Sequence, residues 1–258
     1  MKIVVLMKEV PDTYGERKLN LETGLAERSD SEAVLDEIGE RALELALSLA
    51  GSLDSPEITV VSMTPESATT TLRKALAMGA DKLVHIADEK LVGADLGLTA
   101  EVLAAAIRRT GFDLVIAGNL STDGQGGVIP AMLAELLGVP HASSLTSVEV
   151  SAERVHGTRE TDGGIMEVAA ALPAVISITE RFPAGRFPNF KGIMAAKKKP
   201  VEKLTAADLE VDPEALDVPR SIMLAVSERP ARSAGMKIVD EGDAGEKLAE
   251  FLIQNRLA

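Results

Sequence analysis

The hydrophobic pattern of this chain is dominated by short apolar runs separated by amphipathic stretches. Rich in β-branched residues and almost uninterrupted, the runs occupy residues 2–7, 57–63, 82–87, 113–118 and 174–179. Runs of this kind are typical of strands that are buried on both faces of a parallel sheet. We therefore predict five core strands at these positions.

Three amphipathic helices are predicted between the first four strands. The first covers Ile38–Leu49, the second begins with Thr64 as its N-cap and ends before Gly79, and the third covers Leu98–Arg109 and stops at Gly111. Strands that alternate with helices form right-handed βαβ crossovers. The pattern thus predicts an α/β fold with a doubly wound, mostly parallel sheet.

The pattern changes after Gly138. Three alternating stretches, at residues 147–151, 154–160 and 165–172, predict antiparallel strands that extend one edge of the sheet, with a hairpin turn at Asp162–Gly164. From about residue 201 the chain mixes proline, alanine and charge, and an amphipathic helix is predicted at Ala244–Gln254. This tail has too little apolar surface for a core of its own, so we expect it to pack on a partner.

Composition excludes several classes of function. The chain of 258 residues contains no cysteine, which rules out thiol catalysis, iron–sulfur ligation and disulfides. With 40 acidic and 27 basic residues its net charge is −13, which disfavours nucleic-acid binding. No segment has the length or apolarity of a signal peptide core or a membrane span, so we expect a soluble cytoplasmic protein without membrane insertion. Aromatic residues make up only 2% of the chain, so another chain is expected to complete any pocket for a ring system.

A glycine-rich stretch, AGNLSTDGQGGVIPAMLAELLG, covers Ala117–Gly138. It predicts the end of a buried strand at Gly118, a turn, and a helix at Val128–Leu137. Backbone N–H groups in such a turn and the positive end of the helix suit a phosphate group. The loop has no lysine or arginine and is not a Walker sequence, so hydrolysis of a pyrophosphate is not indicated. A tight turn with Asp123 as the helix N-cap is the alternative interpretation.

A second segment, RFPAGRFPNFKGIMAAKKKP at residues 181–200, is basic within an acidic chain. It carries Phe182, Phe187 and Phe190, three of the five phenylalanines. Apolar side chains rimmed by charge often mark a docking site. A solvated lysine run after an edge strand is the alternative.

Five stretches together resemble the β-subunit family of electron transfer flavoprotein over residues 1 to about 205: MKEVPDT, LRKALAMGAD, RETDGG, LPAVISI and GRFPNFKGIMAAKKKP. The resemblance implies a Rossmann-like fold of the adenine-nucleotide α-hydrolase type. It also implies a non-catalytic subunit that pairs with an α subunit, on which most of the redox-active FAD is bound. Electrons would come from acyl-CoA and other dehydrogenases and pass to a membrane quinone oxidoreductase, while the β subunit buries a structural AMP. No catalytic residue and no metal site is predicted.

The resemblance also assigns site residues and a domain plan. It implies a nucleotide-binding domain at residues 1–205 and an arm at 206–258 that packs on the α subunit. Thr13 and Ile38 match positions near the flavin ring. The residues implied to contact AMP are Leu6, Asp36, Glu37, Ile38, Gly39, Met63, Gly118, Asn119, Ser121, Thr122, Asp123, Gly124, Gln125, Gly126, Gly127, Val128 and Ile129. Amides of Gln125 to Val128 would cradle the phosphate, and Leu6 and Met63 would pack on adenine.

The basic segment matches the family's docking loop, in which Phe190 takes the place of the hydrophobic anchor that inserts into dehydrogenases. Glu160 matches an acidic residue linked to motion of the flavin domain. The sequence PAGR before the anchor departs from the usual NEPR, which leaves the preferred dehydrogenase open. The residues implied to dock partners are Arg186, Phe187, Phe190, Ile193, Met194, Lys197, Lys198 and Lys199.

The loop sequence DGQGGVIP matches neither the AMP-binding nor the bifurcating members of the family well. The segment DEIG and the short loop favour AMP. A bifurcating subunit that binds a second FAD and NADH is one alternative. A stand-alone adenine-nucleotide-binding domain is another.

Overall fold

The computed structural model describes residues 1–28, 32–51, 53 and 55–257. These residues form two compact units, Met1–Leu224 and Ala225–Ala258. The second unit contains one helix, α6 (Ala244–Gln254), at the bounds that the sequence predicted. The predicted domain limit at residue 205 lies inside the first unit, and the packing of the C-terminal arm on a partner stays a prediction.

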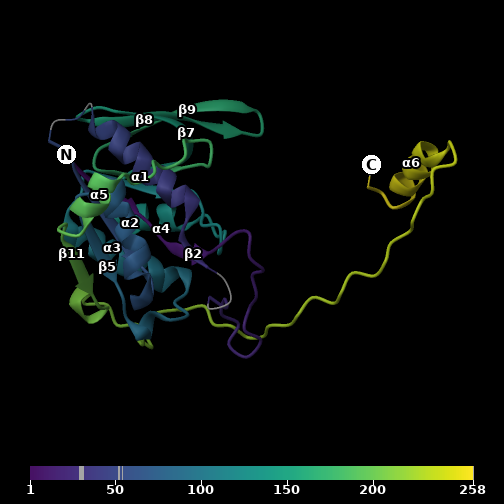
Figure 1. Ribbon diagram of the computed structural model, residues 1–258, viewed down its shortest axis with the longest axis horizontal. Helices are drawn as coiled ribbons and strands as arrows, with labels where there is room; N and C mark the ends of the chain where they lie inside the picture. The colour runs from purple at the N-terminus through teal and green to yellow at the C-terminus, as the bar shows by residue number, and fades with distance from the viewer. Residues whose placement is uncertain (29–31, 52, 54, 258) are drawn as a thin grey trace. The chain divides into compact units, whose positions relative to one another are not determined.

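The first unit is built on a nine-stranded sheet with the order β11-β5-β4-β1-β6-β10-β7-β8-β9. Figure 1 labels strands from its two ends, β11 and β5 at one and β7, β8 and β9 at the other. The five predicted core strands are confirmed as parallel neighbours: β1 (Lys2–Leu6), β4 (Glu57–Met63), β5 (Lys82–Ile86), β6 (Leu114–Gly118) and β10 (Ala174–Ile178). Sequence analysis missed β11 (Val201–Leu204), which pairs in parallel with β5. The α/β fold with a mostly parallel sheet is therefore confirmed.

The antiparallel extension is confirmed at the opposite edge of the sheet. It consists of β7 (His141–Val150), β8 (Arg154–Thr161) and β9 (Gly164–Ala171), and the turn between the last two lies where the sequence predicted it. β7 is parallel to β10, while β8 and β9 are antiparallel to their neighbours.

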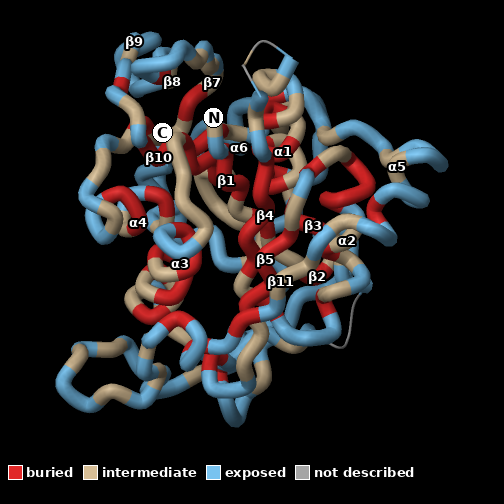
Figure 2. Tube along the Cα trace, turned by 90° about the vertical axis from the view of Figure 1, so that its left-hand side faces the viewer, coloured by how far each residue is buried: buried red, intermediate tan, exposed pale blue. Residues whose placement is uncertain are grey.

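Four helices cover the two faces of the sheet: α1 (Glu37–Ala50), α2 (Thr69–Met78), α3 (Leu96–Thr110) and α4 (Ile129–Leu137). Figure 2 shows α1 and α2 on one side of the central strands and α3 and α4 on the other. Successive residues of β1 serve opposite cores, since Val4 packs in the cluster with α3 and α4 and Val5 in the cluster with α1 and α2. This two-sided burial explains the uninterrupted apolar runs. No helix among the described residues is long and apolar enough to cross a membrane.

The ends of the helices follow the sequence with one correction. Gly79, Gly111 and Gly138 all have positive φ and follow α2, α3 and α4, as predicted. The prediction that Thr64 caps the second helix was wrong, because a 3₁₀ turn at Glu66–Ala68 precedes α2. The hydroxyl of Thr64 instead lies 3.1 Å from Nε2 of the buried His85, whose ring needs polar partners inside the core.

Short strands, one short helix and 3₁₀ turns complete the unit. The short strands β2 (Glu9–Pro11) and β3 (Ala33–Leu35) form an antiparallel ribbon, which sequence analysis missed. We call residues 8–28, which follow β1 and include β2, the N-terminal arm. The helix α5 (Phe190–Ala196) lies within the basic segment and packs against α2. Further 3₁₀ turns occupy Glu89–Leu91 and Ala207–Leu209.

Candidate functional site

The candidate site is a cavity of about 440 Å³ at the carboxyl ends of the central strands. Leu6, Met63 and Gly118 are the last residues of β1, β4 and β6, and all three line it. Doubly wound sheets place their ligands at this edge. The volume lies within the range of small-molecule sites.

Most residues that the resemblance assigned to the nucleotide meet in this cavity. Those that line it are Leu6, Asp36, Gly39, Met63, Gly118, Asn119, Ser121, Gly124, Gly126, Gly127, Val128 and Ile129. Those outside its lining are Thr13, Glu37, Ile38, Thr122, Asp123 and Gln125. Among these, Thr13 is exposed in the N-terminal arm, whereas Ile38 is buried in α1 and packs against Gly118.

The start of α4 supplies hydrogen-bond donors to the cavity. Within the described part of the chain, the amides of Gly126, Gly127, Val128 and Ile129 have no acceptor. Val128 is the N-cap residue and its side chain makes no capping bond. Four donors at the positive end of a helix form an arrangement that suits an anion.

Apolar side chains form another part of the lining of the cavity. Besides Leu6 and Met63, the side chains of Val61, Leu96 and Leu103 line it. Leu96 and Leu103 belong to α3, and the sequence had not connected this helix with the site. Its place in the chain gave a signal, because a helix that follows β5 begins at the same edge of the sheet. The side-chain oxygen of Asn119 is buried and has no donor within the described residues. The cavity therefore combines donors for an anion, an apolar wall and one unused acceptor.

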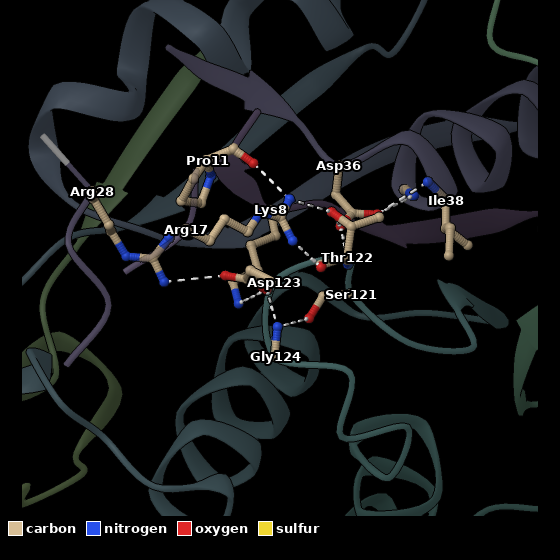
Figure 3. A network of polar contacts seen from close by, with 11 residues as sticks. Lys8, Pro11, Arg17, Arg28, Asp36, Ile38, Ser121, Thr122, Asp123 and Gly124 are labelled. Carbon is tan, nitrogen blue, oxygen red and sulfur yellow. Dashed lines mark hydrogen bonds and ion pairs between the residues drawn. The ribbon is translucent and has the colours of Figure 1, made fainter. Parts of the chain in front are cut away.

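Asp36 joins α1 to the glycine-rich loop. Its Oδ1 accepts hydrogen bonds from the amides of Ile38 and Gly39, which caps α1. Its Oδ2 accepts from the amide of Thr122 at 2.7 Å and from the Thr122 hydroxyl at 2.9 Å (Figure 3). Only 3% of Asp36 is exposed, so one buried carboxylate holds both the helix and the loop.

Asp123 is not the N-cap of α4, and that prediction was wrong. Its carboxylate points toward the N-terminal arm, where Oδ1 lies 2.8 Å from Nζ of Lys8 and Oδ2 lies 3.1 Å from a guanidinium nitrogen of Arg28 (Figure 3). Burial of the carboxyl acts to raise the pKa of Asp123, but the hydrogen bond and charge of Lys8 outweigh it and hold that pKa well below its ordinary value. Lys8 and Arg28 of the N-terminal arm thus pair with Asp123, which the local sequence suggested as the N-cap of α4.

The N-terminal arm also contacts the glycine-rich loop through Arg17. Its guanidinium donates to the carbonyl of Thr122 and, at 2.7 Å, to the carbonyl of Pro11. The glycine-rich loop contains no cation of its own, but the fold brings three to it from the arm. Because these residues lie about 100 positions earlier in the chain, only the folded structure shows them.

The basic segment 181–200 is fixed at its beginning by α1. The guanidinium of Arg186 forms two hydrogen bonds of 2.8 Å with the carboxylate of Glu44, and its amide donates to the same group at 3.0 Å. The hydrogen bond from Arg186 holds the pKa of Glu44 below its ordinary value. Arg41 donates to the carbonyl of Phe182, whose ring is only 8% exposed and belongs to the core.

The end of the segment is fixed by α2. Nζ of Lys199 donates to the carbonyls of Leu76, Gly79 and Ala80 at the end of that helix. Lys197 and Lys198 are exposed. Glu160, at the tip of the extension, forms an ion pair of 2.6 Å with Arg181.

Between these anchors, large apolar side chains face solvent. Phe187 is 92% exposed and Phe190 is 80% exposed, while Ile193 and Met194 are about half exposed. Apolar groups held out in this way by a fixed backbone are typical of a docking surface. We call these four residues the apolar docking patch.

Comparison with known proteins gives the family. The model of the "Electron transfer flavoprotein domain" matches residues 23–209. A relative from Mycobacterium leprae named "Electron transfer flavoprotein subunit beta" is 47% identical over 262 residues, which cover 99% of this chain and 98% of the relative. Relatives of the same name from Syntrophomonas wolfei and Bacillus subtilis are 35% and 32% identical, each over 98% of this chain and 96% of their own length. These names describe subunits of an electron carrier rather than enzymes. The chain belongs to the electron transfer flavoprotein family and matches its β subunits along nearly its whole length.

Proposed function

We propose that this chain is the β subunit of a heterodimeric electron transfer flavoprotein and holds AMP in the cavity as a structural ligand. The observation that carries the proposal is the cavity itself, which joins free amides at the start of α4 to an apolar wall. The amides of Gly126 to Ile129 suit the phosphate, and Leu6 and Met63 suit the adenine ring. The unused acceptor of Asn119 suits a hydroxyl or amino group of the nucleotide.

The partner of this chain is an α subunit that binds most of the FAD. When bound, FAD accepts and releases the transferred electrons, and this chain supplies the surface beside it. The exposed Thr13 is suited to face a flavin of the partner, whereas the buried Ile38 is suited to support the loop at Gly118. Of the arm predicted at residues 206–258, the second unit, Ala225–Ala258, is the part suited to pack on the α subunit, since α6 has no buried residue of its own, whereas Ala206 and Leu209 are buried in the core beside α3.

The apolar docking patch receives dehydrogenases, including acyl-CoA dehydrogenases. Phe190 is the anchor, and Arg186 and the lysines 197–199 surround it, with Lys199 also fixing the segment to α2. Electrons then pass to a membrane quinone oxidoreductase. We place the complex in the cytoplasm.

The test is to purify the chain together with its α partner and add an acyl-CoA dehydrogenase with its substrate. The flavin of the complex should be reduced, which is measured from the loss of its visible absorbance. A complex that carries no reducible flavin would contradict the electron-carrier role. Reduction by NADH alone, with two flavins per complex, would instead favour the bifurcating alternative, and a stable nucleotide-loaded monomer would favour the stand-alone domain.

A further inference from the structure

Lys8 is fixed at the mouth of the cavity by the backbone on both sides. It comes two residues after the end of β1, and the amide of the preceding Met7 continues the pairing with β4 by donating to Val61. The carbonyl of Lys8 accepts a hydrogen bond of 2.9 Å from the amide of Asp36. Its side chain lines the cavity and is 39% exposed. The ammonium group therefore has a defined position and still reaches solvent.

Its hydrogen-bonding capacity is only partly used. A lysine ammonium carries three donors. Within the described residues, Asp123 is the single acceptor for this ammonium, at 2.8 Å. Two donors thus remain, on a side chain that lines the same cavity as the free amides of Gly126 and Gly127.

The charges around the loop leave a surplus for an anion. Lys8, Arg17 and Arg28 contribute three positive charges, and Asp36 and Asp123 contribute two negative ones. Asp36 makes four hydrogen bonds, with Thr122, Ile38 and Gly39, and no cation among the described residues pairs with it. Among the charged side chains that bond to the loop, positive groups therefore outnumber negative ones by one, which is favourable for a phosphate beside a helix N-terminus in a chain whose total charge is −13.

We propose that Lys8 is the cation that pairs with the phosphate of the bound nucleotide, and that Asp123 is the positioning residue that holds the Lys8 ammonium beside the cavity. This inference rests on the proposed nucleotide site and adds a specificity-determining residue to it. Lys8 makes the site prefer a nucleotide to the corresponding nucleoside.

The test compares the affinities of AMP and adenosine. The heterodimer is stripped of nucleotide and titrated with each ligand by calorimetry. Lys8→Met should weaken AMP about tenfold or more, because a hydrogen bond to a charged group is lost, and should change adenosine binding less than about twofold. Lys8→Arg should restore most of the preference for AMP.

Two further variants separate recognition from folding. Lys2→Met removes a cation from the other end of the same strand and should leave both affinities unchanged. Lys8→Met combined with Asp123→Asn removes both members of the ion pair, so no carboxylate is left without its lysine. This double variant should bind AMP as weakly as Lys8→Met does.

The outcomes distinguish this inference from the proposed function. If the parent complex binds neither AMP nor adenosine, the nucleotide site itself is wrong. If the parent binds AMP and Lys8→Met keeps the same ratio of AMP to adenosine affinity, the role of Lys8 is overturned. An equal loss of both ligands in Lys8→Met and in the double variant would also overturn it, since that result indicates a structural effect.

Discussion

The glycine-rich loop at residues 118–129 and the basic segment at residues 181–200 are built to suit opposite kinds of ligand. The glycine-rich loop presents backbone amides and small side chains around a cavity, and its cations come from the N-terminal arm. The basic segment presents large apolar side chains on the outside, with Phe190 80% exposed. The first suits a small anion enclosed by the chain, and the second suits a protein surface.

Both regions are nevertheless fastened to α1. Asp36 at its beginning accepts hydrogen bonds from Thr122 of the glycine-rich loop, and Glu44 accepts them from Arg186 of the basic segment. These two carboxylates are separated by about 12 Å along the helix axis, at 1.5 Å per residue. One helix, α1, therefore sets the position of two unlike surfaces, and substitutions at its two ends should affect them separately.

The largest effect is expected from Asp36→Ala. It removes the cap of α1 and the acceptor for Thr122, and the unfolding free energy should fall by about 2 to 4 kcal/mol. Chemical denaturation of the heterodimer measures this loss, and chromatography of released nucleotide should show reduced AMP.

Asp36→Asn provides the matched control. Asparagine still caps a helix well, but it has only one acceptor oxygen, so the bonds to Thr122 are lost. We expect Asp36→Asn to recover most of the unfolding free energy that Asp36→Ala loses, but to keep the reduced AMP content. Full AMP content in both variants would show that Asp36 does not hold the loop for its ligand.

Phe190→Ala should leave stability and nucleotide content unchanged, because the ring is mostly exposed. Loss of an anchor at a protein interface costs about 2 kcal/mol, or roughly thirtyfold in affinity. The concentration of acyl-CoA dehydrogenase that gives half-maximal flavin reduction measures the change. Val92→Ala, which shortens an exposed apolar side chain outside both segments, is the control, and an equal effect of the two would remove Phe190 from the docking site.

Acid should lower the unfolding free energy by protonating Asp123 of the glycine-rich loop. Its pKa is depressed in the folded chain, so its stabilisation is complete above the ordinary aspartate pKa and is lost as the pH falls toward the folded value. Between pH 6 and pH 3 the unfolding free energy should lose about 1 kcal/mol from this group. Asp123→Asn should show a flatter profile over the same range, and parallel profiles for the two proteins would contradict the ion pair.

Glu44→Gln should have the smallest effect on stability and should alter only the basic segment at residues 181–200. The pair with Arg186 is partly exposed, so its loss should cost about 1 kcal/mol or less in stability. We expect faster cleavage by trypsin within 181–200 and unchanged AMP content. Unaltered cleavage would show that other contacts fix the segment.

The core strands could be predicted from the sequence, because their apolar runs are a local pattern. The runs at 2–7 and 113–118 are apolar because both faces of β1 and β6 are buried, and the strands appeared as expected. The glycine-rich stretch at residues 117–138 predicted the turn after β6, and residues of that turn line the cavity.

Contacts between distant residues could not be predicted in this way. Lys8 and Asp123 are 115 positions apart, and Glu44 and Arg186 are 142 apart, so no local pattern relates them. Asp123 was assigned to α4 because aspartate is a common N-cap, but in the folded chain the cations of the arm compete for it. The three-residue strands β2 and β3 are too short to show a period.

The most direct test of the account is to count the nucleotides in the purified heterodimer. The complex is denatured with acid, and AMP and FAD are quantified by chromatography against the protein concentration. The account predicts about one AMP and one FAD per heterodimer, with the AMP in the cavity of this chain. Two FAD and no AMP would contradict it and would make the glycine-rich loop part of a second flavin site.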